Sequence, residues 1–483
     1  MQDKQFASYL DSWLPEHEEE IVQSLIDLLG INSVGAKGSP GKPFGQEVDR
    51  ALNWFVDKAQ GFGMKTRNVE GYAAHAEIGA GQEMAMALTH IDIVPAGSGW
   101  SRNPFGEVFG DQIYGRGSQD NKGPTVACLY ALRAIKESGA PLKRRIRHVV
   151  GGNEESGFRC VQHYFEVEEK PTYGFSPDAA FPLVFAEKGS MNIQVEFDLP
   201  DVTTATADCH LVDLYGGERP NIVAAKATAV LKVPQSHEDE IIAMLEEQVE
   251  GARQSVGGPG LLEFAFTKEP GCLVVTASGK AAHAADPDQG TNALTALCFV
   301  LGRMGPRLAV SDALRFAGEA GHIHGKGLCL ESQDDISGRL TCNLGTATVD
   351  AKGDAKTVRA IYNIRYPVKV SGEELKRRAE NCPRPDYVRL TVLSVGKPHY
   401  TDPDSFLVKS LLKIYREETG DLSSPPIAIG GGTYAKVIPG GVAFGPSKPG
   451  APELAHQADE RIALDDLLQL VRIYARALFA LAT

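Results

Sequence analysis

The stretch MAMALTHIDIV (84–94) is short, apolar and bounded by polar turns. Such a run is typical of a strand buried on both faces of a parallel sheet. Helical spacing of apolar residues and further apolar runs predict helices over 4–30, 46–62 and 123–138, and strands over 72–78 and 144–152. The alternation of strand and helix predicts an α/β fold with helices on both faces of the sheet.

From about residue 189 the pattern changes. SMNIQVEFDL (190–199) alternates apolar and polar residues, as half-buried antiparallel strands do. Helices are predicted within this region over 237–254, 290–304 and 372–381. We therefore expect an α+β domain over 189–390, inserted between two parts of the first domain, 1–188 and 391–483.

Composition excludes several classes of protein. The chain has 483 residues, 43% of them hydrophobic, and a net charge of −13. An acidic chain is a poor candidate for binding nucleic acid or anionic membranes. No apolar run approaches the roughly 20 residues of a membrane span. The eight cysteines include no CxxC pair, and the start, MQDKQFASYLDSWLPEHEEE, is unlike a signal peptide. We therefore expect a cytoplasmic protein with reduced, mostly buried thiols.

His90 and Asp92 lie at the C-terminal end of the apolar strand, the edge where open α/β sheets bind ligands. One residue between them places both on the same side of a strand. An imidazole that binds a metal through one nitrogen can hydrogen-bond a carboxylate through the other. Taken alone, this pair is a weak signal for a metal site.

Two further segments place acidic residues next to the ends of a predicted helix and a predicted strand. GRGSQDNKGP (115–124) presents Asp120 from a Gly-rich loop before a helix, where it could bridge two cations or simply cap the helix. GGNEESG (151–157) places Glu154 and Glu155 side by side after a buried strand. Adjacent carboxylates repel unless a cation is present, although a solvated acidic loop is the alternative interpretation.

The last two elements are single residues. Asp178 lies between two prolines in SPDAAFP (176–182), and His456 lies in PGAPELAHQADERIALDDL near the C-terminus. A lone loop histidine is more often a surface residue than a ligand.

Together these segments resemble the M20 family of metallopeptidases, and within it the PepV-type, carnosinase-like bacterial dipeptidases. The resemblance covers essentially the whole chain and is carried by THIDIVPAGSGW…GRGSQDNKGP…NEESG…SPDAAFP. It implies a catalytic domain of the di-metal aminopeptidase type, with a mixed, mostly parallel sheet and an inserted α+β lid domain. It also implies a monomer that takes dipeptides, while the acidic composition predicts no nucleic-acid or membrane partner.

The resemblance implies a role for each residue. His90 and Asp178 would hold one divalent ion, Glu155 and His456 the other, and Asp120 would bridge the two. Imidazole and carboxylate ligands suit zinc, with manganese or cobalt as alternatives. Asp92 would orient His90. Glu154 would be the general base that activates a water bridging the metals.

The inserted domain would supply groups that contact the substrate. His283, in GKAAHAADPDQGTNAL, matches a histidine that stabilises the oxyanion. Arg365 and Asn221 match positions that contact the substrate carboxylate, for which arginine is well suited. Gly431 and Gly432, in GGGTYAK (430–436), match a pocket-lining loop. Without the resemblance, each is as readily a structural residue.

Three positions depart from the family's usual pattern. Asn121 and Asn153 stand where an acid is common, and Ala180 where aspartate is frequent. None removes an expected metal ligand, but they leave metal preference and specificity open.

We expect hydrolysis of short unblocked peptides, mainly dipeptides. One alternative within the family is an N-acyl amino acid deacylase. A second, from another class, is a catalytically silent peptide- or metal-binding homologue, which Glu154 argues against because a binding site needs no free base.

Overall fold

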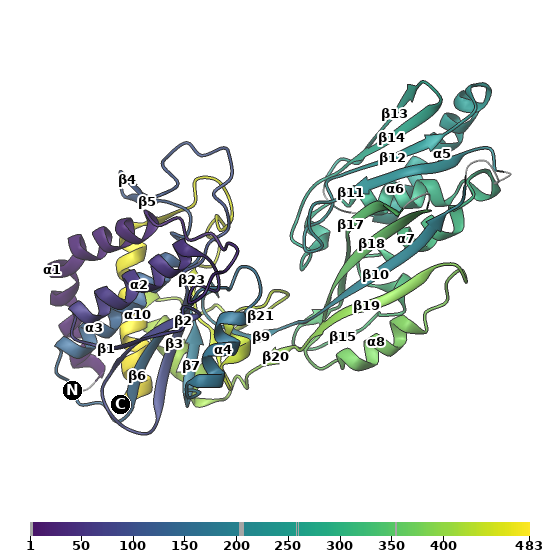
Figure 1. Ribbon diagram of the computed structural model, residues 1–483. Helices are drawn as coiled ribbons and strands as arrows, with labels where there is room; N and C mark the ends of the chain where they lie inside the picture. Colours follow the sequence, from purple (N-terminus) through teal and green to yellow (C-terminus); the bar gives the residue numbers. More distant parts are fainter. Residues whose placement is uncertain (1–2, 202–206, 257, 259, 353–354) are drawn as a thin grey trace. The chain divides into compact units, whose positions relative to one another are not determined.

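The structure is a computed structural model, and it describes residues 3–201, 207–256, 258, 260–352 and 355–483 (Figure 1). The chain divides into two compact units. Unit 1 comprises Met1–Ala186, Tyr400–Ile427 and Gly432–Thr483, and unit 2 comprises Glu187–His399 and Ala428–Gly431. Each unit has its own hydrophobic core.

The sheet of unit 1 is mixed. Its strands run in the order β1 (Lys65–Val69), β2 (Ala73–Ile78), β6 (Arg145–Gly151), β3 (Met84–His90), β7 (Tyr173–Ser176), β22 (Val442–Ala443), β9 (Val184–Glu187) and β20 (His399–Tyr400), and β21 (Ile427–Ile429) also pairs with β9. The central strands β6, β3, β7 and β22 are parallel, whereas β1, β2 and β9 pair antiparallel. The predicted mixed sheet is confirmed, with its parallel part confined to the centre.

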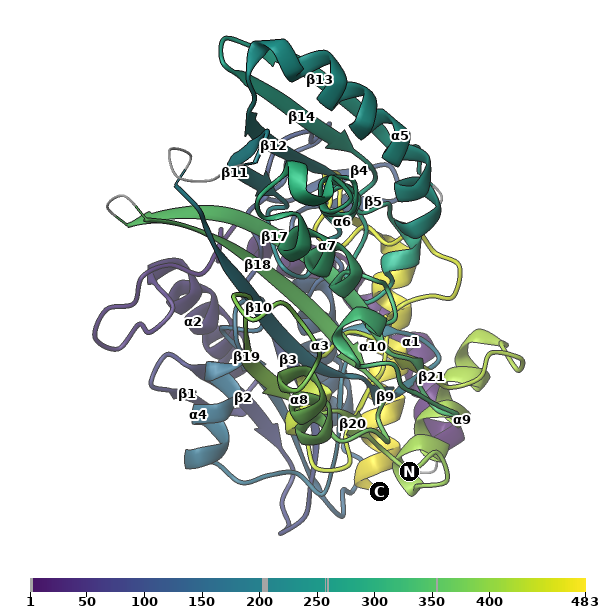
Figure 2. The same cartoon turned by 90° about the vertical axis from the view of Figure 1, so that its right-hand side faces the viewer.

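Helices cover both faces of this sheet, as predicted. They are α1 (Asp3–Leu29), α2 (Gln46–Gly61), α3 (Lys122–Glu137), α4 (Arg159–Val167), α9 (Phe406–Thr419) and α10 (Leu464–Ala482). Figure 2 shows α2 and α4 on one side of the strands and α1, α9 and α10 on the other. Every residue of β2 and β3 is therefore buried.

α2 illustrates why these segments are helical. Its buried residues recur at helical spacing, which gives the helix one apolar face: Val48, Ala51, Leu52, Phe55 and Ala59. Phe55 is fully buried and packs edge-on against His148 of β6, with 5.1 Å between ring centroids. Burying such a side chain contributes roughly 1.5–3 kcal/mol.

β3 ends at His90, earlier than the apolar run suggests. The expectation that His90 and Asp92 share one side of a strand is therefore wrong, because Asp92 lies in the following loop. Its carboxylate accepts hydrogen bonds from the main chain of residues 154 and 155.

Unit 2 is built on one antiparallel sheet. Its strands run in the order β13 (Glu263–Glu269), β14 (Cys272–Ser278), β12 (Lys226–Lys232), β11 (His210–Gly216), β17 (Thr341–Lys352), β18 (Ala355–Tyr366), β10 (Gly189–Leu199) and β19 (Arg389–Gly396). Burial alternates along β10, so one face of the sheet lies in the core. The helices of this unit are α5 (Glu238–Val256), α6 (Ala293–Gly302), α7 (Ser311–Ala320) and α8 (Gly372–Glu380).

The bounds of unit 2 differ from the expected insertion, 189–390. The unit continues to His399 because β19 pairs with β10 along most of its length. It also includes Ala428–Gly431, so Gly431 belongs to unit 2 and Gly432 to unit 1.

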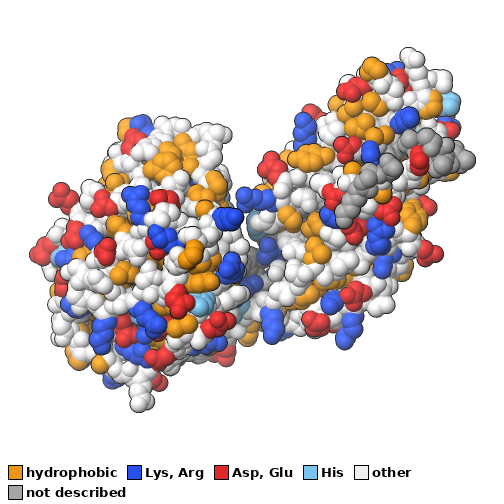
Figure 3. Space-filling model, in the orientation of Figure 1, with side chains coloured by type: hydrophobic (Ala, Val, Ile, Leu, Met, Phe, Trp, Pro, Cys, Tyr) orange, Lys and Arg blue, Asp and Glu red, His pale blue; other side chains and the backbone are white. Residues whose placement is uncertain are grey.

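Acidic and basic side chains are interspersed on the visible face of each unit (Figure 3). Among the residues that the structure describes, no helix is both long enough and apolar enough to cross a bilayer. All eight cysteines are free thiols; six are buried, Cys272 is half-buried and Cys329 is exposed.

Candidate metal centre

Three neighbouring parallel strands of unit 1 carry the first ligand candidates. His90 is the last residue of β3, Glu154 and Glu155 follow β6, and Asp178 follows β7. Because β6, β3 and β7 are adjacent and parallel, their carboxyl ends meet at one edge of the sheet. Asp120 reaches this edge from the loop before α3.

Asp120 lies between two histidines. Its Oδ1 is 2.9 Å from Nε2 of His90, and its Oδ2 is 3.0 Å from Nε2 of His456. Nε2 of His456 is also 3.0 Å from Oε1 of Glu155, and Nε2 of His90 is 3.5 Å from Oδ1 of Asp178. One carboxylate thus connects residues that are 366 positions apart in the sequence, 90 and 456.

The donor atoms form two groups, each within 4.8 Å: His90, Glu154 and Asp178, and Asp120, Glu155 and His456. All five expected ligands are therefore brought together, and Glu154 lies among them. Glu154, the expected general base, lies with His90 and Asp178 in the first of these groups.

The hydrogen bonding of His90 prepares one nitrogen for ligation. The imidazole is fully buried, and its Nδ1 lies 3.0 Å from the main-chain carbonyl oxygen of Asp92. Since a carbonyl only accepts, Nδ1 carries the proton and Nε2 faces the carboxylates. The Asp92 main chain, more than its side chain, therefore orients this ring.

The electrostatics show a site crowded with negative charge. Burial, Asp178 and the other nearby carboxylates raise the pKa of Glu154 well above its ordinary value, despite His90. Burial also raises the pKa of Asp178 to about 6, against the opposing effect of His90. Hydrogen bonds to Asp120 and Glu155 raise the pKa of His456 to about 10. Carboxylates crowded in this way repel one another when they are ionised, and a bound cation would relieve that repulsion.

These residues fit a pair of divalent ions. The site offers two imidazoles and four carboxylates, the donor types that zinc accepts and that manganese and cobalt share. The nearby asparagines do not disturb it. Nδ2 of Asn121 donates to Oδ1 of Asp178 at 3.1 Å and to the carbonyl of Pro177 at 2.7 Å, which an aspartate could not do. Asn153 donates to Ser156 in its own loop and accepts the N–H of Arg159, the first residue of α4.

The expected residues of unit 2 lie partly together. His283 and Ile222 form an isolated bridge, and the carbonyl of Asn221 accepts the N–H of Ala284 at 2.9 Å. Arg365 lies on β18, where its Nε donates to Oδ1 of Asn363 at 3.0 Å. Burial lowers the pKa of Arg365.

Three residues near the centre were not singled out from the sequence as site residues. Lys122 is fully buried; its Nζ donates to the carbonyls of Leu28 and Ile31, and burial lowers its pKa to about 7. Tyr434 fills the space beside Gly151, where a Cβ would lie 2.4 Å from its hydroxyl. Glu460 holds the loop that carries Asp120. Glu460 lies in HQADE (456–460), four residues after the expected ligand His456, but the acidic segment around it gives no local signal of this contact.

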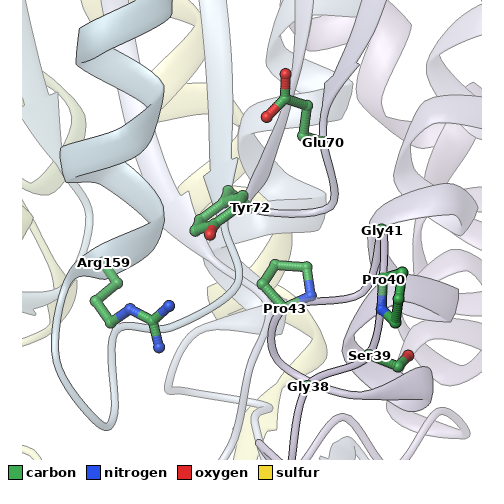
Figure 4. A pocket seen from close by; sticks show the side chains of 8 residues that line it. All are labelled: Gly38, Ser39, Pro40, Gly41, Pro43, Glu70, Tyr72 and Arg159. Carbon is green, nitrogen blue, oxygen red and sulfur yellow. The ribbon is translucent and has the colours of Figure 1, made fainter.

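A wide pocket of about 800 Å³ lies elsewhere on unit 1 and contains none of the candidate ligands. Figure 4 shows Arg159 on one side of it and Ser39 and Pro40 on the other. The two groups of candidate metal ligands lie instead at the carboxyl ends of the parallel strands.

A mixed α/β fold with paired imidazole–carboxylate groups at the carboxyl ends of its parallel strands defines a metal-dependent hydrolase. The sequence profile of peptidase family M20/M25/M40 matches residues 86–480. The chain belongs to this family.

Curated relatives extend over nearly the whole chain. It is 37% identical to the putative dipeptidase YtjP of Bacillus subtilis (strain 168) over 475 residues, which are 96% of this chain and 98% of the relative. It is 33% identical to the putative dipeptidase SH1171 of Staphylococcus haemolyticus over the same shares of both chains.

Solved structures share the fold. Human carnosine dipeptidase 1 matches with a TM-score of 0.54 and 15% identity over 98% of this chain and 99% of that one. The dipeptidase Dug1p of Saccharomyces cerevisiae matches with a TM-score of 0.56 and 12% identity over 99% of both chains. At these identities the likeness shows the fold alone.

Proposed function

We propose that this protein is a di-metal dipeptidase that hydrolyses the peptide bond of short unblocked peptides. The main support for this function is the position of the Asp120 carboxylate. One of its oxygens contacts His90, the other contacts His456, and Glu154 lies in the same cluster of donor groups. The names of the relatives at 33–37% identity support the substrate class.

In this proposal, Glu155 and His456 hold one ion, His90 and Asp178 the other, and Asp120 bridges them. Two divalent ions bound there supply Lewis-acid polarisation of a carbonyl and a lowered pKa for water. Zinc is the ion we favour, with manganese and cobalt as alternatives.

The side chains supply the proton transfers. Glu154 accepts a proton from the attacking water and then gives it to the departing amine. Its burial among carboxylates raises the pKa of this carboxyl, and a raised pKa helps such a group to accept a proton. In unit 2, we assign His283 to the oxyanion and Arg365 and Asn221 to the substrate carboxylate, and Gly431 and Gly432 to the pocket lining.

Recognition of a free carboxylate at one end and a free amine at the other would limit the length of the substrate. Within the family, PepV-type specificity is the form we favour. The acidic charge of −13 and the free thiols support a cytoplasmic protein without a nucleic-acid partner, and we propose a monomer.

The test is a panel of free dipeptides beside the matching N-acetyl amino acids. Each is incubated with chelator-treated protein, and again after zinc, manganese or cobalt is added back. We expect metal-dependent cleavage of the free dipeptides alone. Cleavage of only the acylated compounds would make the protein a deacylase with the same site. Absence of turnover with every metal would favour the silent binding homologue.

A further inference from the structure

Glu460 is a buried acid that binds the loop of the metal centre. It lies four residues after His456, directly before β24 (Arg461–Ala463), and has no exposed surface. Its Oε1 accepts three main-chain N–H groups, from Gly117 at 3.1 Å, Gln119 at 2.9 Å and Asp120 at 3.2 Å.

The charge of Glu460 is matched inside the protein. Its Oε2 accepts a hydrogen bond from the Arg116 guanidinium at 2.6 Å, and Arg116 is only 1% exposed. The second terminal nitrogen of Arg116 donates to the carbonyl of Ala96. A buried carboxylate is retained at low cost only when charge and hydrogen bonds are satisfied in this way.

The main chain of Glu460 contributes as well. Its carbonyl accepts the N–H of Gly115 at 2.9 Å, so this one residue binds the segment 115–120 at its beginning and at its end. On the other side, Nε2 of Gln119 donates to the carbonyl of Arg461, the residue after Glu460, at 2.9 Å. The loop that carries His456 is therefore attached to the loop that carries Asp120 through several hydrogen bonds.

This attachment determines the spacing of two ligand candidates. Asp120 is held through its own N–H by Glu460, and its Oδ2 lies 3.0 Å from Nε2 of His456 on the same loop as Glu460. A change in the side chain of Glu460 displaces the Asp120 main chain relative to His456. Displacement of this kind alters the distance between two ligands of one ion.

We infer that Glu460 is a positioning residue for the metal centre, which sets the geometry of Asp120 and His456 and so the affinity for the ion that His456 and Glu155 hold. This inference rests on the proposed function. Glu460 would then both stabilise the fold and position metal ligands. A matched variant elsewhere in unit 1 can separate these two roles.

Glu418 provides that variant. It too is a nearly buried acid, with its side chain 7% exposed, and it accepts hydrogen bonds from Arg472 and Arg476, which join α9 to α10. Glu460→Gln removes the carboxylate that pairs with Arg116, and Glu418→Gln removes one of several carboxylates around Arg472 and Arg476. Both changes should lower the temperature of unfolding. Only Glu460→Gln should change metal binding.

The experiment is a Co²⁺ titration of chelator-treated protein, followed by visible absorption. Wild type and Glu418→Gln should each bind two equivalents of Co²⁺, and the affinities of the variant should equal those of wild type. In Glu460→Gln, one equivalent should bind roughly 10- to 100-fold more weakly, the effect typical of losing a group that orients ligands. Glu460→Asp keeps the charge opposite Arg116 but shortens the side chain, and it should weaken the same equivalent.

Co²⁺ affinities within twofold of wild type in both Glu460 variants would overturn the inference and leave the dipeptidase proposal standing. Equal weakening in Glu418→Gln would overturn it too, because general destabilisation would then explain the loss. A wild-type protein that binds no Co²⁺ would instead overturn the proposed function, and this inference with it.

Discussion

The carboxylate of Asp92 binds the main chain of Glu154: its Oδ1 accepts the N–H of that residue at 2.9 Å. Its Oδ2 accepts the next N–H, that of Glu155, at 3.1 Å. The side chain of Asp92 is 2% exposed, so both hydrogen bonds are shielded from water. Asp92 therefore determines where the two adjacent glutamates of the centre lie.

We expect Asp92→Asn to lower kcat/KM for a dipeptide roughly 10- to 100-fold, the usual effect of losing a group that orients ligands. The amide nitrogen of asparagine cannot accept a hydrogen bond, so one of the two N–H groups loses its partner. Steady-state kinetics with saturating metal measures the effect. The exposed pair Glu47–Arg50 offers a control, because Glu47→Gln should change nothing. Full activity in Asp92→Asn would show that the position of the loop does not depend on Asp92.

Glu154→Gln should reduce kcat by roughly 10² to 10⁴-fold, the contribution typical of a general base. Glutamine has nearly the same volume but cannot accept the proton. Co²⁺ titration distinguishes the roles of this residue, since it lies within 4.8 Å of His90 and Asp178. Retention of two equivalents with loss of turnover supports a base. Loss of one equivalent would make Glu154 a ligand, and undiminished turnover would exclude both roles.

The fold and the ligand candidates were accessible from the sequence for a simple reason. Buried strands such as MAMALTH can be recognised in the sequence as apolar runs, and adjacent parallel strands bring their carboxyl ends to the same edge of the sheet. Asp120, Glu155 and His456 could be placed because each lies in a short Gly- or Pro-rich motif of a recognisable pattern.

What was missed lacks a local signal. α4 and α7 were not predicted. They are short helices of 9 and 10 residues, and neither has a capping side chain, whereas the equally short α6 and α8 begin at the capping residues Asn292 and Ser371. Glu460 is followed by arginine in an acidic segment, which is typical of a solvated surface. Its three N–H donors come from residues more than 300 positions away, so only the tertiary structure reveals them.

Arg365→Met should raise the KM for free dipeptides roughly tenfold to a hundredfold, the value of a hydrogen-bonded charge on a carboxylate. Burial lowers the pKa of this guanidinium, and a carboxylate bound beside it would offset the cost of burying its charge. The KM for dipeptide amides, which lack the carboxylate, should change little, and comparison of the two substrates is the measurement.

Arg359 provides the control for Arg365. It lies on the same face of β18 but pairs with Glu196 and Asp350. Arg359→Met should therefore leave both KM values unchanged. If Arg365→Met raises the KM for dipeptide amides as much as the KM for free dipeptides, a role of Arg365 in carboxylate recognition would be excluded.

Acid should destabilise unit 1 through His148. Burial lowers the pKa of this imidazole to about 3, and burial with Arg147 lowers that of His75 to about 4. Histidine in the unfolded chain has a pKa of about 6.5, so below that pH the unfolded chain binds protons that the folded chain does not. The free energy of unfolding therefore decreases as the pH falls from about 6.5. For His148 alone, the loss between pH 7 and pH 5 is about 2 kcal/mol.

His148→Gln should remove that part of the pH dependence. Glutamine does not titrate and can reach Thr89, whose Oγ1 lies 2.8 Å from Nε2 of His148. Urea unfolding followed by tryptophan fluorescence measures it in unit 1, because all three tryptophans, Trp13, Trp54 and Trp100, belong to this unit. Phe55→Leu is the matched control: it weakens the packing against the same imidazole and should lower stability equally at both pH values. If His148→Gln loses as much stability between pH 7 and pH 5 as wild type, the acid sensitivity arises from other groups.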